Sequence, residues 1–399
     1  MNLSTKILAG LIVGVVAGLV LGADGLAFAN TWIAPLGTIF MNLIKMMIVP
    51  LVFSSLVVGV CGLGDIGKMG RIGGKTFCLY MATTFVAIAI GIFFGLLFQP
   101  GVGLDMSTEG LKVAAKQAPS LGKVLMDIFP SNPLVSMTKA NMLQIIVFSL
   151  ALGAGIVAAG EKAKVVADFF EGFAEACYKI IGYIMDLAPI GVFGLITPVI
   201  AKNGPAVLMP LIKIIAAVYL ACAVHAIFVY GGLLSVSGIN AVKYLKNVMP
   251  ASLLAFTSCS SGGTLPVTLD CVRKMGISQG ISSFVLPLGA TINMDGTAAY
   301  QGVCALFVAQ IYGVDLSFSQ YAIIVITGTL ASIGTAGVPG AGFIMLTLVL
   351  TALGLPLEGS ALVAGIDRIL DMPRTSVNVT GDSVVCALVA KSEGEEVNL

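Results

Sequence analysis

Charged side chains are scarce in this chain. Asp, Glu, Lys and Arg make up 10% of the 399 residues, whereas 58% of the residues are apolar. Soluble domains carry roughly 25% charged residues, so this chain could not cover its apolar surface with polar groups in water. The shortage of charge excludes an ordinary soluble globule and predicts an integral membrane protein in contact with lipid.

An excess of charge of either sign is also absent. The 21 Lys and Arg residues are balanced by 20 Asp and Glu residues, which leaves a formal net charge of +1. Polyanions are attracted by a strongly basic surface. We therefore expect no nucleic acid partner.

Residue types that carry enzyme chemistry are few. His225 is the only histidine and lies in an apolar run, where we expect a buried structural side chain rather than a metal ligand or proton relay. The eight cysteines contain no CxxC pair, which gives no support to a zinc site or a disulfide framework. Neither a Ser/His/Asp arrangement nor an HExxH motif is visible, so the sequence does not indicate an enzyme.

Long apolar runs, by contrast, recur along the first half of the chain. A helix needs about 20 apolar residues to cross a bilayer. We expect helices near 7–23, 35–63, 76–99, 138–160, 177–201 and 205–236. The alternating pattern of barrel strands is absent, which leaves helices as the spanning elements. The first run lacks a convincing signal-peptide cleavage site, and we interpret it as a retained helix.

Positive residues are unevenly distributed between the first loops. The loop at 24–34 has no Lys or Arg, whereas the loop at 63–75 contains Lys68, Arg71 and Lys75. Cytoplasmic loops carry the excess of positive residues. This bias predicts a multi-pass protein whose N-terminus is cytoplasmic.

After residue 240, small residues interrupt two apolar segments. The break at 257–264 is rich in Ser and Gly, and the break at 331–340 is rich in Gly. Each half of an interrupted segment is too short to cross a membrane, so we expect two re-entrant helical hairpins. Each is followed by a helix with a polar motif, and paired broken segments indicate a transporter binding site. The alternative is two unrelated kinks, because Gly and Pro are common in membrane helices.

Polar residues near the C-terminus follow a helical spacing. Asp371, Arg374, Thr375, Asn378 and Asp382 fall on one helical face. The planar guanidinium of Arg374 suits a carboxylate, and Asp371 suits an ammonium group. The pair indicates an acidic amino acid as the substrate. The alternative is a salt bridge between Asp371 and Arg374 that only stabilises the helix in lipid.

Oxygen-bearing side chains are clustered in the same motifs. Asn293, Asp295, Asn378 and Asp382 offer amide and carboxylate oxygens, which are the ligands that hard cations prefer. We expect Na⁺, because unwound backbone and half-helix ends coordinate it in secondary transporters. The alternative is that Asn293 and Asn378 form only interhelical hydrogen bonds.

The segments at 260–266, 286–297, 331–342 and 365–382 resemble the glutamate/aspartate transporter family, the dicarboxylate/amino acid:cation symporters, in its prokaryotic form. The earlier apolar runs agree in number and order, so the resemblance covers essentially the whole chain. It implies an all-α polytopic membrane protein with eight transmembrane helices, two re-entrant helical hairpins and inverted repeats.

The resemblance also implies a homotrimer in the cell inner membrane that works by an elevator mechanism. Residues 1–75 would form a scaffold with the first two spans, and residues 100–203 would form the rest of the scaffold and the trimer contacts. The span at 76–99 and residues 204–399 would form the moving transport domain, which contains both hairpins and the substrate site.

By the same resemblance, Arg374 would bind the side-chain carboxylate of the substrate, and Asp371 would bind its amino group. Asn378 and the backbone around Ser261 would hold the main-chain carboxylate. The full expected set is Arg374, Asp371, Thr375, Asn378, Thr297, Ser261, Ser260, Val338 and Gly342.

Three sodium sites are implied as well, with Na⁺ as a co-transported ion and no organic cofactor. The first would use Gly289, Asn293, Asn378 and Asp382. The second would use Thr291, Met294, Ser332, Ile333 and Thr335. The third would use Tyr80, Thr83, Thr84, Asn293 and Asp295.

The chain departs from the family pattern at three positions. Cys259 and Met372 stand where many relatives carry an extra arginine near the substrate. Gln301 stands where eukaryotic relatives have a glutamate linked to proton and potassium countertransport. We expect this chain to lack that countertransport.

The sequence therefore predicts a sodium-coupled symporter of aspartate or glutamate. A proton-coupled carrier of glutamate or C4-dicarboxylates is the alternative. An ion channel is disfavoured, because its polar residues would line a continuous path, whereas those of this chain gather in one place.

Overall fold

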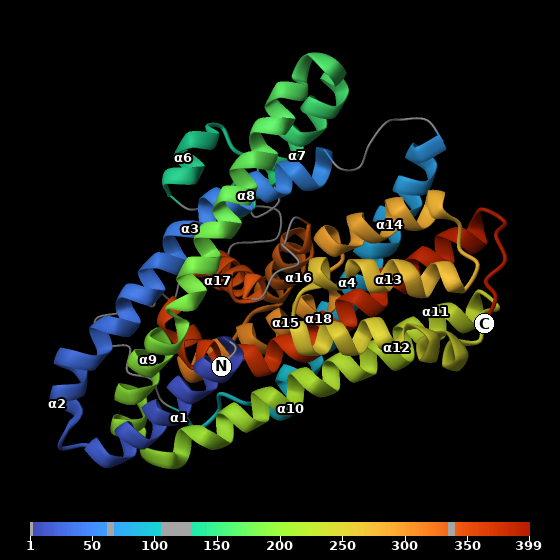
Figure 1. Ribbon diagram of the computed structural model, residues 1–399. Coiled ribbons are helices and arrows are strands. Elements are labelled where there is room, and N and C mark those ends of the chain that lie inside the picture. Colours follow the sequence, from blue (N-terminus) through green and yellow to red (C-terminus); the bar gives the residue numbers. More distant parts are fainter. Residues whose placement is uncertain (1–2, 62–67, 105–128, 140, 334–339) are drawn as a thin grey trace.

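The computed structural model of the protein describes residues 3–61, 68–104, 129–139, 141–333 and 340–399 (Figure 1). The secondary structure of these residues is entirely helical, with no strand, which confirms the predicted all-α class. The helices expected near 7–23, 35–63, 138–160 and 205–236 are found within about one turn of their predicted ends. The helix expected at 76–99 begins earlier, at Lys68.

The helices of the N-terminal half, apart from α4, pack together in one group. The helices of this half are α1 (Leu3–Leu21), α2 (Leu26–Phe28), α3 (Ala34–Cys61), α4 (Lys68–Phe98), α6 (Pro133–Thr138), α7 (Met142–Ala159), α8 (Lys164–Asp186) and α9 (Ala188–Asn203). α1 packs along α9, and α3 packs against α7, α8 and α9 (Figure 1). Close approach of α1 to α9 requires glycine, because a Cβ on Gly10 would lie 2.3 Å from the carbonyl oxygen of Pro189. α4 leaves this group and packs against the C-terminal half.

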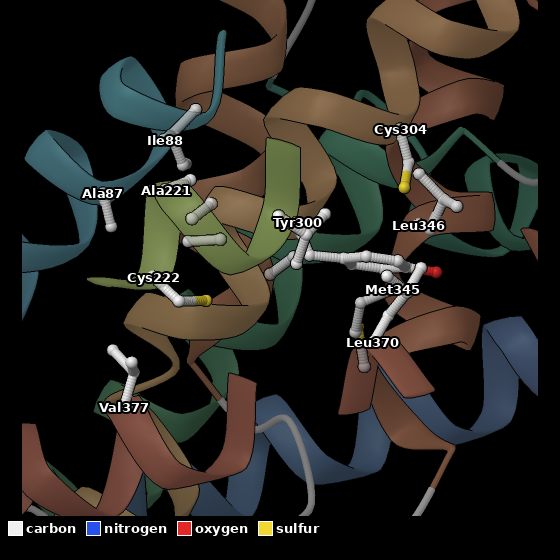
Figure 2. Packing of buried hydrophobic residues seen from close by; sticks show 14 of the residues in the cluster. Ala87, Ile88, Ala221, Cys222, Tyr300, Cys304, Met345, Leu346, Leu370 and Val377 are labelled. Carbon is white, nitrogen blue, oxygen red and sulfur yellow. The ribbon is translucent and has the colours of Figure 1, made fainter. Parts of the chain in front are cut away.

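The C-terminal half is built around α15. Its helices are α10 (Leu208–Val224), α11 (Gly231–Val236), α12 (Ala241–Ser258), α13 (Ser261–Lys274), α14 (Gln279–Ile292), α15 (Asp295–Ile311), α16 (Phe318–Ser332), α17 (Ala341–Leu353) and α18 (Ser360–Ser392). Nearly all of α15 is buried, against α4, α10, α16, α17 and α18. Side chains such as Ile88, Tyr300 and Leu346 pack together between these helices (Figure 2).

The structure corrects one predicted helix. A single span was expected at 177–201, but α8 ends at Asp186 and α9 begins at Ala188. The helical stretches Val147–Ile184 and Ala188–Lys202 are bent by 55° relative to each other. Pro189 lies in the first turn of α9, where a residue without an N–H group is tolerated, whereas within a continuous helix it would remove a hydrogen bond. The chain therefore turns at this proline.

Two helical stretches of the described residues are long and apolar enough to cross a membrane, namely Arg71–Phe98 and Leu208–Val236. The bent pair of Val147–Ile184 and Ala188–Lys202 adds a third if it is one span. The count of eight spans remains a prediction.

Both interrupted segments form pairs of packed helices with a break between them. α12 ends at Ser258, and Cys259 adopts a left-handed conformation with φ of 54°. Ser260 then begins α13, its hydroxyl accepting a hydrogen bond from the Gly263 N–H at 3.0 Å. In the second pair, α16 ends at Ser332, and α17 follows Gly340, which has φ of 83°. Polar and small residues at the breaks thus end one helix and start the next.

The C-terminal tail connects three elements at one end of this half. Glu393, which follows α18, pairs with Arg71 and accepts a hydrogen bond from the Lys75 ammonium at 2.7 Å, both on α4. The Ser278 N–H donates to the Glu395 carboxylate at 2.9 Å, and the Asn398 N–H donates to the Met275 carbonyl at 2.8 Å. These contacts tie the end of α18 to α4 and to the connection between α13 and α14. The two cationic partners lower the pKa of Glu393 to about 2.

We predict that Glu393→Gln lowers the thermal unfolding temperature of the detergent-solubilised protein, because it removes both ion pairs. Because the pKa of the Glu393 carboxyl is lowered, its ion pairs stabilise the folded protein fully above the ordinary pKa of 4.5. This stabilisation is lost as the pH falls toward about 2. The difference between variant and wild type should therefore be constant from about pH 5 to 8 and shrink below that range. Glu161→Gln, at an exposed carboxylate, is the control. An unchanged unfolding temperature at neutral pH would contradict an anchoring role.

Candidate functional site

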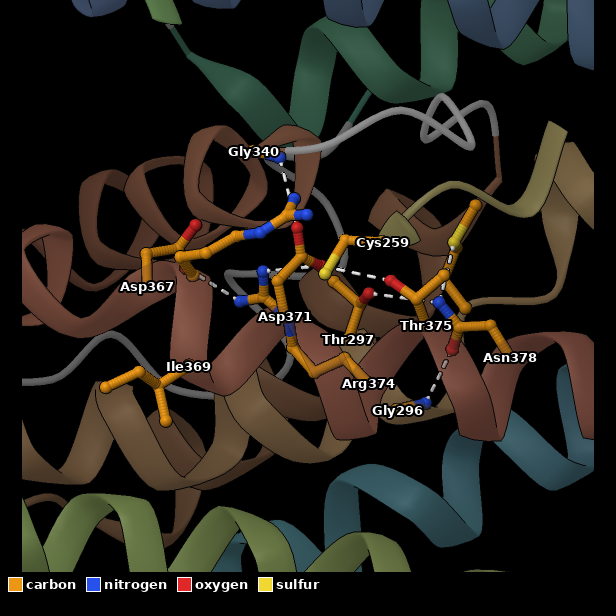
Figure 3. Close-up of polar contacts among 12 residues, drawn as sticks. Cys259, Gly296, Thr297, Gly340, Asp367, Ile369, Asp371, Arg374, Thr375 and Asn378 are labelled. Carbon is orange, nitrogen blue, oxygen red and sulfur yellow. Dashed lines mark hydrogen bonds and ion pairs between the residues drawn. The ribbon is translucent and has the colours of Figure 1, made fainter. Parts of the chain in front are cut away.

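A buried guanidinium lies at the centre of the polar face of α18. The side chain of Arg374 is fully buried. Its Nη1 donates a hydrogen bond to Asp367 Oδ1 at 2.9 Å, and its Nη2 lies 3.0 Å from Asp371 Oδ1 (Figure 3). The Tyr300 ring of α15 packs 4.0 Å from Cζ, a distance suited to a cation–π contact. Two acids and one aromatic face therefore hold a single cation.

The salt bridge between Asp371 and Arg374, which the sequence left open as an alternative, is present in the structure. It is one of two ion pairs, since Asp367 also contacts Arg374. Sequence reasoning missed Asp367 as a site residue, although it lies two turns before Arg374 on the same face of the helix. One acid would suffice to neutralise Arg374, so a purely neutralising role does not explain the second.

Asp371 also connects α18 with the beginning of α17. Its Oδ2 accepts a hydrogen bond from the Gly340 N–H at 3.3 Å, and its Oδ1 accepts one from the Thr375 hydroxyl at 3.1 Å. The N-terminal end of a helix carries partial positive charge, which favours a nearby carboxylate. The second broken helix pair therefore meets α18 at Asp371.

The beginning of α15 crosses α18 in close contact. A Cβ on Gly296 would lie 2.3 Å from the Arg374 carbonyl oxygen, so only glycine allows the two backbones to approach. Asn378 fixes this crossing: its Oδ1 accepts from the Gly296 N–H at 2.8 Å, and its Nδ2 donates to the Thr297 hydroxyl at 3.3 Å. The predicted residues Thr297 and Asn378 are thus brought together beside Arg374.

Gly342 of α17 faces the guanidinium directly. A Cβ at this position would lie 3.1 Å from Arg374 Cζ and 3.2 Å from the Thr297 methyl group. The Nε group of Arg374 has no hydrogen-bond acceptor among the described residues, and its Nη2 group meets Asp371 as an ion pair without a hydrogen bond. Val338, which was expected on the same segment, lies outside the described residues.

The tip of the α12–α13 pair also lies against α18. Ser260 caps α13, and Ser261, its first residue, is buried. Arg368 of α18 donates hydrogen bonds to the carbonyl oxygens of Thr257 and Ser258, at 3.3 and 3.2 Å. Helices α13 and α17 begin at Ser261 and Ala341. The N-terminal ends of both helices therefore lie in segments that contact α18 close to Arg374.

The first set of predicted cation ligands is assembled in one place. Asn293 Nδ2 donates to Asp382 Oδ1 at 2.9 Å and to the Asn378 carbonyl at 3.2 Å. A Cβ on Gly289 would lie 2.5 Å from Asp382 Oδ1 and 2.4 Å from the Tyr80 hydroxyl. The buried Asn293 Oδ1 has no hydrogen-bond donor among the described residues. Carboxylate, amide and carbonyl oxygens thus converge at the break between α14 and α15, as a cation site requires.

Asp295 forms a second buried acidic centre at the start of α15. Its Oδ1 accepts from the Thr84 hydroxyl at 2.6 Å, and its Oδ2 accepts from the Tyr230 hydroxyl at 2.7 Å and lies 3.1 Å from His225 Nε2. The contact with Thr84 agrees with the expected third set. His225 is buried, as expected, but it contacts a predicted ligand, as does Tyr230. Neither contact was predicted, because both residues come from the π-helical turn after α10.

The remaining expected ligands are only partly assembled. Tyr80 donates to the Val285 carbonyl at 3.1 Å and its hydroxyl lies beside Gly289. The hydroxyls of Thr83, Thr291 and Ser332 bond to carbonyls of their own helices. Met294 Sδ accepts from Asn378 Nδ2 at 3.2 Å. Ile333 follows the end of α16, and Thr335 lies outside the described residues.

A group of three or more His, Cys, Asp and Glu side chains placed to hold a metal ion is absent from the part of the chain that the structure describes. Asp295 and Asp382 instead have hydroxyl and amide partners. Such oxygen-rich surroundings fit alkali or alkaline-earth cations better than softer metals.

Comparison with known proteins gives matches over the whole chain. Residues 3–392 match the model of the sodium:dicarboxylate symporter family. The chain is 40% identical over 402 residues to a proton/sodium-glutamate symport protein of Geobacillus stearothermophilus, covering 99% of this chain and 95% of the relative. It is 37% identical to a proton/glutamate-aspartate symporter of Escherichia coli (strain K12), with 98% and 93% covered. A C4-dicarboxylate transport protein of Bacillus subtilis (strain 168) is 35% identical, with 99% and 94% covered.

We predict that Gly296→Ala destabilises the protein, because the added methyl group would overlap the Arg374 carbonyl. Overpacking of this kind costs about 1–3 kcal/mol, so the unfolding temperature in detergent should fall. Gly172→Ala in α8 is the matched control, since a Cβ there meets nothing within 4 Å. The control should retain or slightly raise the unfolding temperature. Equal unfolding temperatures of the two variants would show that α15 and α18 do not pack closely at Gly296.

Proposed function

Because the chain belongs to the sodium:dicarboxylate symporter family, we propose that it is a secondary active symporter that carries aspartate or glutamate together with Na⁺. The family is one of multi-pass membrane transporters and not of enzymes. The observation that carries the proposal is the buried charge around Arg374 and the two neighbouring acidic centres.

The buried ionisable groups leave an excess of negative charge. Arg374 supplies one positive charge, whereas Asp367, Asp371, Asp295 and Asp382, when ionised, supply four negative charges. Among the described residues, three of these negative charges then lack a fixed cationic partner. Burial of uncompensated charge is costly. Mobile cations that enter with the substrate would neutralise this excess, which gives a physical reason for cation coupling.

The arrangement around Arg374 suits a substrate with two carboxylates and one amino group. The unsatisfied N–H groups of Arg374 would bind the side-chain carboxylate, and Thr297 and Gly342 would border it. Asp371 would exchange its contact with Arg374 for the substrate ammonium. The N-terminal end of α13 at Ser260 and Ser261, together with Asn378, would hold the main-chain carboxylate. Thr375 would support Asp371, and Val338 would lie at the edge of the site.

Sodium is the proposed coupling ion. Gly289, Asn293, Asn378 and Asp382 would form one site, in which the free Asn293 Oδ1 is an available ligand. Thr84, Asn293 and Asp295 would form another, with Tyr80 and Thr83 nearby. A further site would use Thr291, Met294, Ser332, Ile333 and Thr335. Sodium is bound by oxygen atoms of these kinds in other secondary transporters.

Proton coupling is the second candidate. It is favoured by the names of two relatives, a proton/sodium-glutamate symport protein and a proton/glutamate-aspartate symporter. A C4-dicarboxylate transport protein among the relatives makes dicarboxylates the alternative substrates. Asp371 favours an amino acid over a dicarboxylate, because its carboxylate would pair with an ammonium group.

We further propose the architecture that the resemblance implied: eight spans and two re-entrant hairpins in the inner membrane, a cytoplasmic N-terminus, and a homotrimer. Residues 1–75 and 100–203 would be the scaffold, and residues 76–99 and 204–399 the transport domain that moves as an elevator. The packing of α1 and α3 on α9, and of α4 on α15, supports this division. The short α12–α13 and α16–α17 pairs support the hairpins.

We predict that the protein reconstituted in liposomes takes up radiolabelled aspartate or glutamate when a sodium gradient is imposed. Neither a proton gradient alone nor a potassium gradient should drive the same accumulation. Succinate should compete weakly, because it lacks the amino group. Absence of uptake, or uptake that does not depend on Na⁺, would refute the sodium-coupled proposal, and uptake driven by a proton gradient alone would support the second candidate.

We predict that Arg374→Ala lowers uptake of acidic substrate by at least about tenfold, because a lost hydrogen bond to a charged group costs about 1.5–3 kcal/mol. Asp371→Asn should weaken amino acid binding more than dicarboxylate binding, since it removes the charge that pairs with ammonium. Lys179→Ala, at an exposed residue of α8, is the control for loss of a positive charge. Normal aspartate uptake by Arg374→Ala would show that the guanidinium has another role.

A further inference from the structure

The C-terminal end of α12 has a cationic partner that has no role in the function proposed above. The last carbonyl groups of a helix lack partners within the helix. In α12, two of these groups, at Thr257 and Ser258, accept hydrogen bonds from Nη2 of Arg368 at 3.3 and 3.2 Å. The C-terminal end of a helix carries partial negative charge, which favours a guanidinium there. Arg368 therefore acts as a charged cap supplied by a different helix.

The position of Arg368 on α18 links this cap to the substrate site. Arg368 directly follows Asp367, and successive residues of a helix point about 100° apart. Asp367 contacts Arg374, whereas Arg368 contacts the tip of the α12–α13 pair. One turn of α18 thus holds both the counter-ion of Arg374 and the contact to the tip. Movement of the tip away from α18 requires that Arg368 release its two carbonyl groups.

The residue between the two helices provides a natural reporter of that movement. Cys259 is 1% exposed (Figure 3). Neither Cys259 on the tip nor Met372 on α18 carries a positive charge. Among the described residues, the hydrogen bonds from a guanidinium of α18 to this tip come from Arg368.

We propose that Arg368 is a positioning residue that clamps the α12–α13 tip onto α18 and so keeps the substrate site closed on that side. A role of this clamp in transport rests on the proposed function. The contact of Arg368 with the tip does not depend on that function. Release of Arg368 would free the tip, uncover Cys259 and open a path to Arg374. The closed tip would also place the N-terminal end of α13 where a carboxylate can bind it.

The first test measures the exposure of Cys259 and does not depend on transport. Purified protein carrying Cys78→Ser, which removes an exposed thiol, is treated with N-ethylmaleimide, and alkylation of the Cys259 peptide is followed by mass spectrometry. Arg368→Met, which keeps the side-chain length without the charge, should raise the alkylation rate by roughly tenfold, because opening no longer breaks charge-assisted hydrogen bonds. Arg368→Lys should give an intermediate rate, since an ammonium can still donate to a carbonyl group.

Lys274→Met at the opposite end of α13 is the matched control, because Lys274 pairs with Asp270 of its own helix. Its Cys259 alkylation rate should equal that of the parent. If Arg368→Met does not give a folded protein, Arg368→Gln replaces it, with the same expected rise. A variant counts as folded when its unfolding temperature is unaltered. If the folded variant alkylates Cys259 at the same rate as the parent, the proposal is overturned.

The second test separates positioning from general stability in the transport assay. Arg368→Met should raise KM for aspartate several-fold while Vmax is retained, because a tip that opens more often holds substrate less well. Arg368→Lys should partly restore KM. A loss of Vmax with KM unchanged would count against a clamp. If the parent protein transports no acidic amino acid, the proposed function fails, and the alkylation rates still decide the role of Arg368.

Discussion

A fully buried guanidinium is the constraint on which the rest of this structure depends. Arg374 is fully buried, and it is stabilised by Asp367 and Asp371 and by the face of Tyr300. A charge in such a place requires compensation from nearby groups. The compensating groups come from α15 and α18, and α17 packs against the guanidinium at Gly342, so these helices must cross tightly. Gly296 and Gly342 make that approach possible, because any larger residue would meet Arg374.

The same constraint connects the fold with the proposed transport. Among the described residues of the C-terminal half, buried acids outnumber the one buried cation, Arg374, and they gather at Arg374, at the α14–α15 break and around Asp295. A molecule that carries further negative charge into this region must bring cations with it. In the proposed function, coupling of substrate to cations then follows from charge compensation and needs no additional structural mechanism. The helix ends that meet α18, and the Arg368 contact to one of them, decide when this region is closed.

Much of the fold followed from local pattern. Apolar runs predicted most helices, because a membrane permits few alternatives to helical backbone. The failure at 177–201 came from treating apolar sequence as continuous, although Pro189 turns the chain there. The polar face of α18 was visible from spacing, and so were its Arg374 and Asp371. Asp367 lies on that face too, and it was missed because a single acid already seemed to satisfy the arginine.

Other contacts could not be found along the chain at all. His225 and Tyr230 reach Asp295 from a π-helical turn 65–70 residues away, and Arg368 reaches the end of α12 across 110–111 residues. The sequence by itself determined the helical membrane class, the breaks and the residue types of the site, since these depend on local hydrophobicity and spacing. Only the tertiary structure decided which groups pair between helices, such as Asn293 with Asp382 and Tyr230 with Asp295, because such pairs depend on distances between helices, which no spacing within one helix encodes.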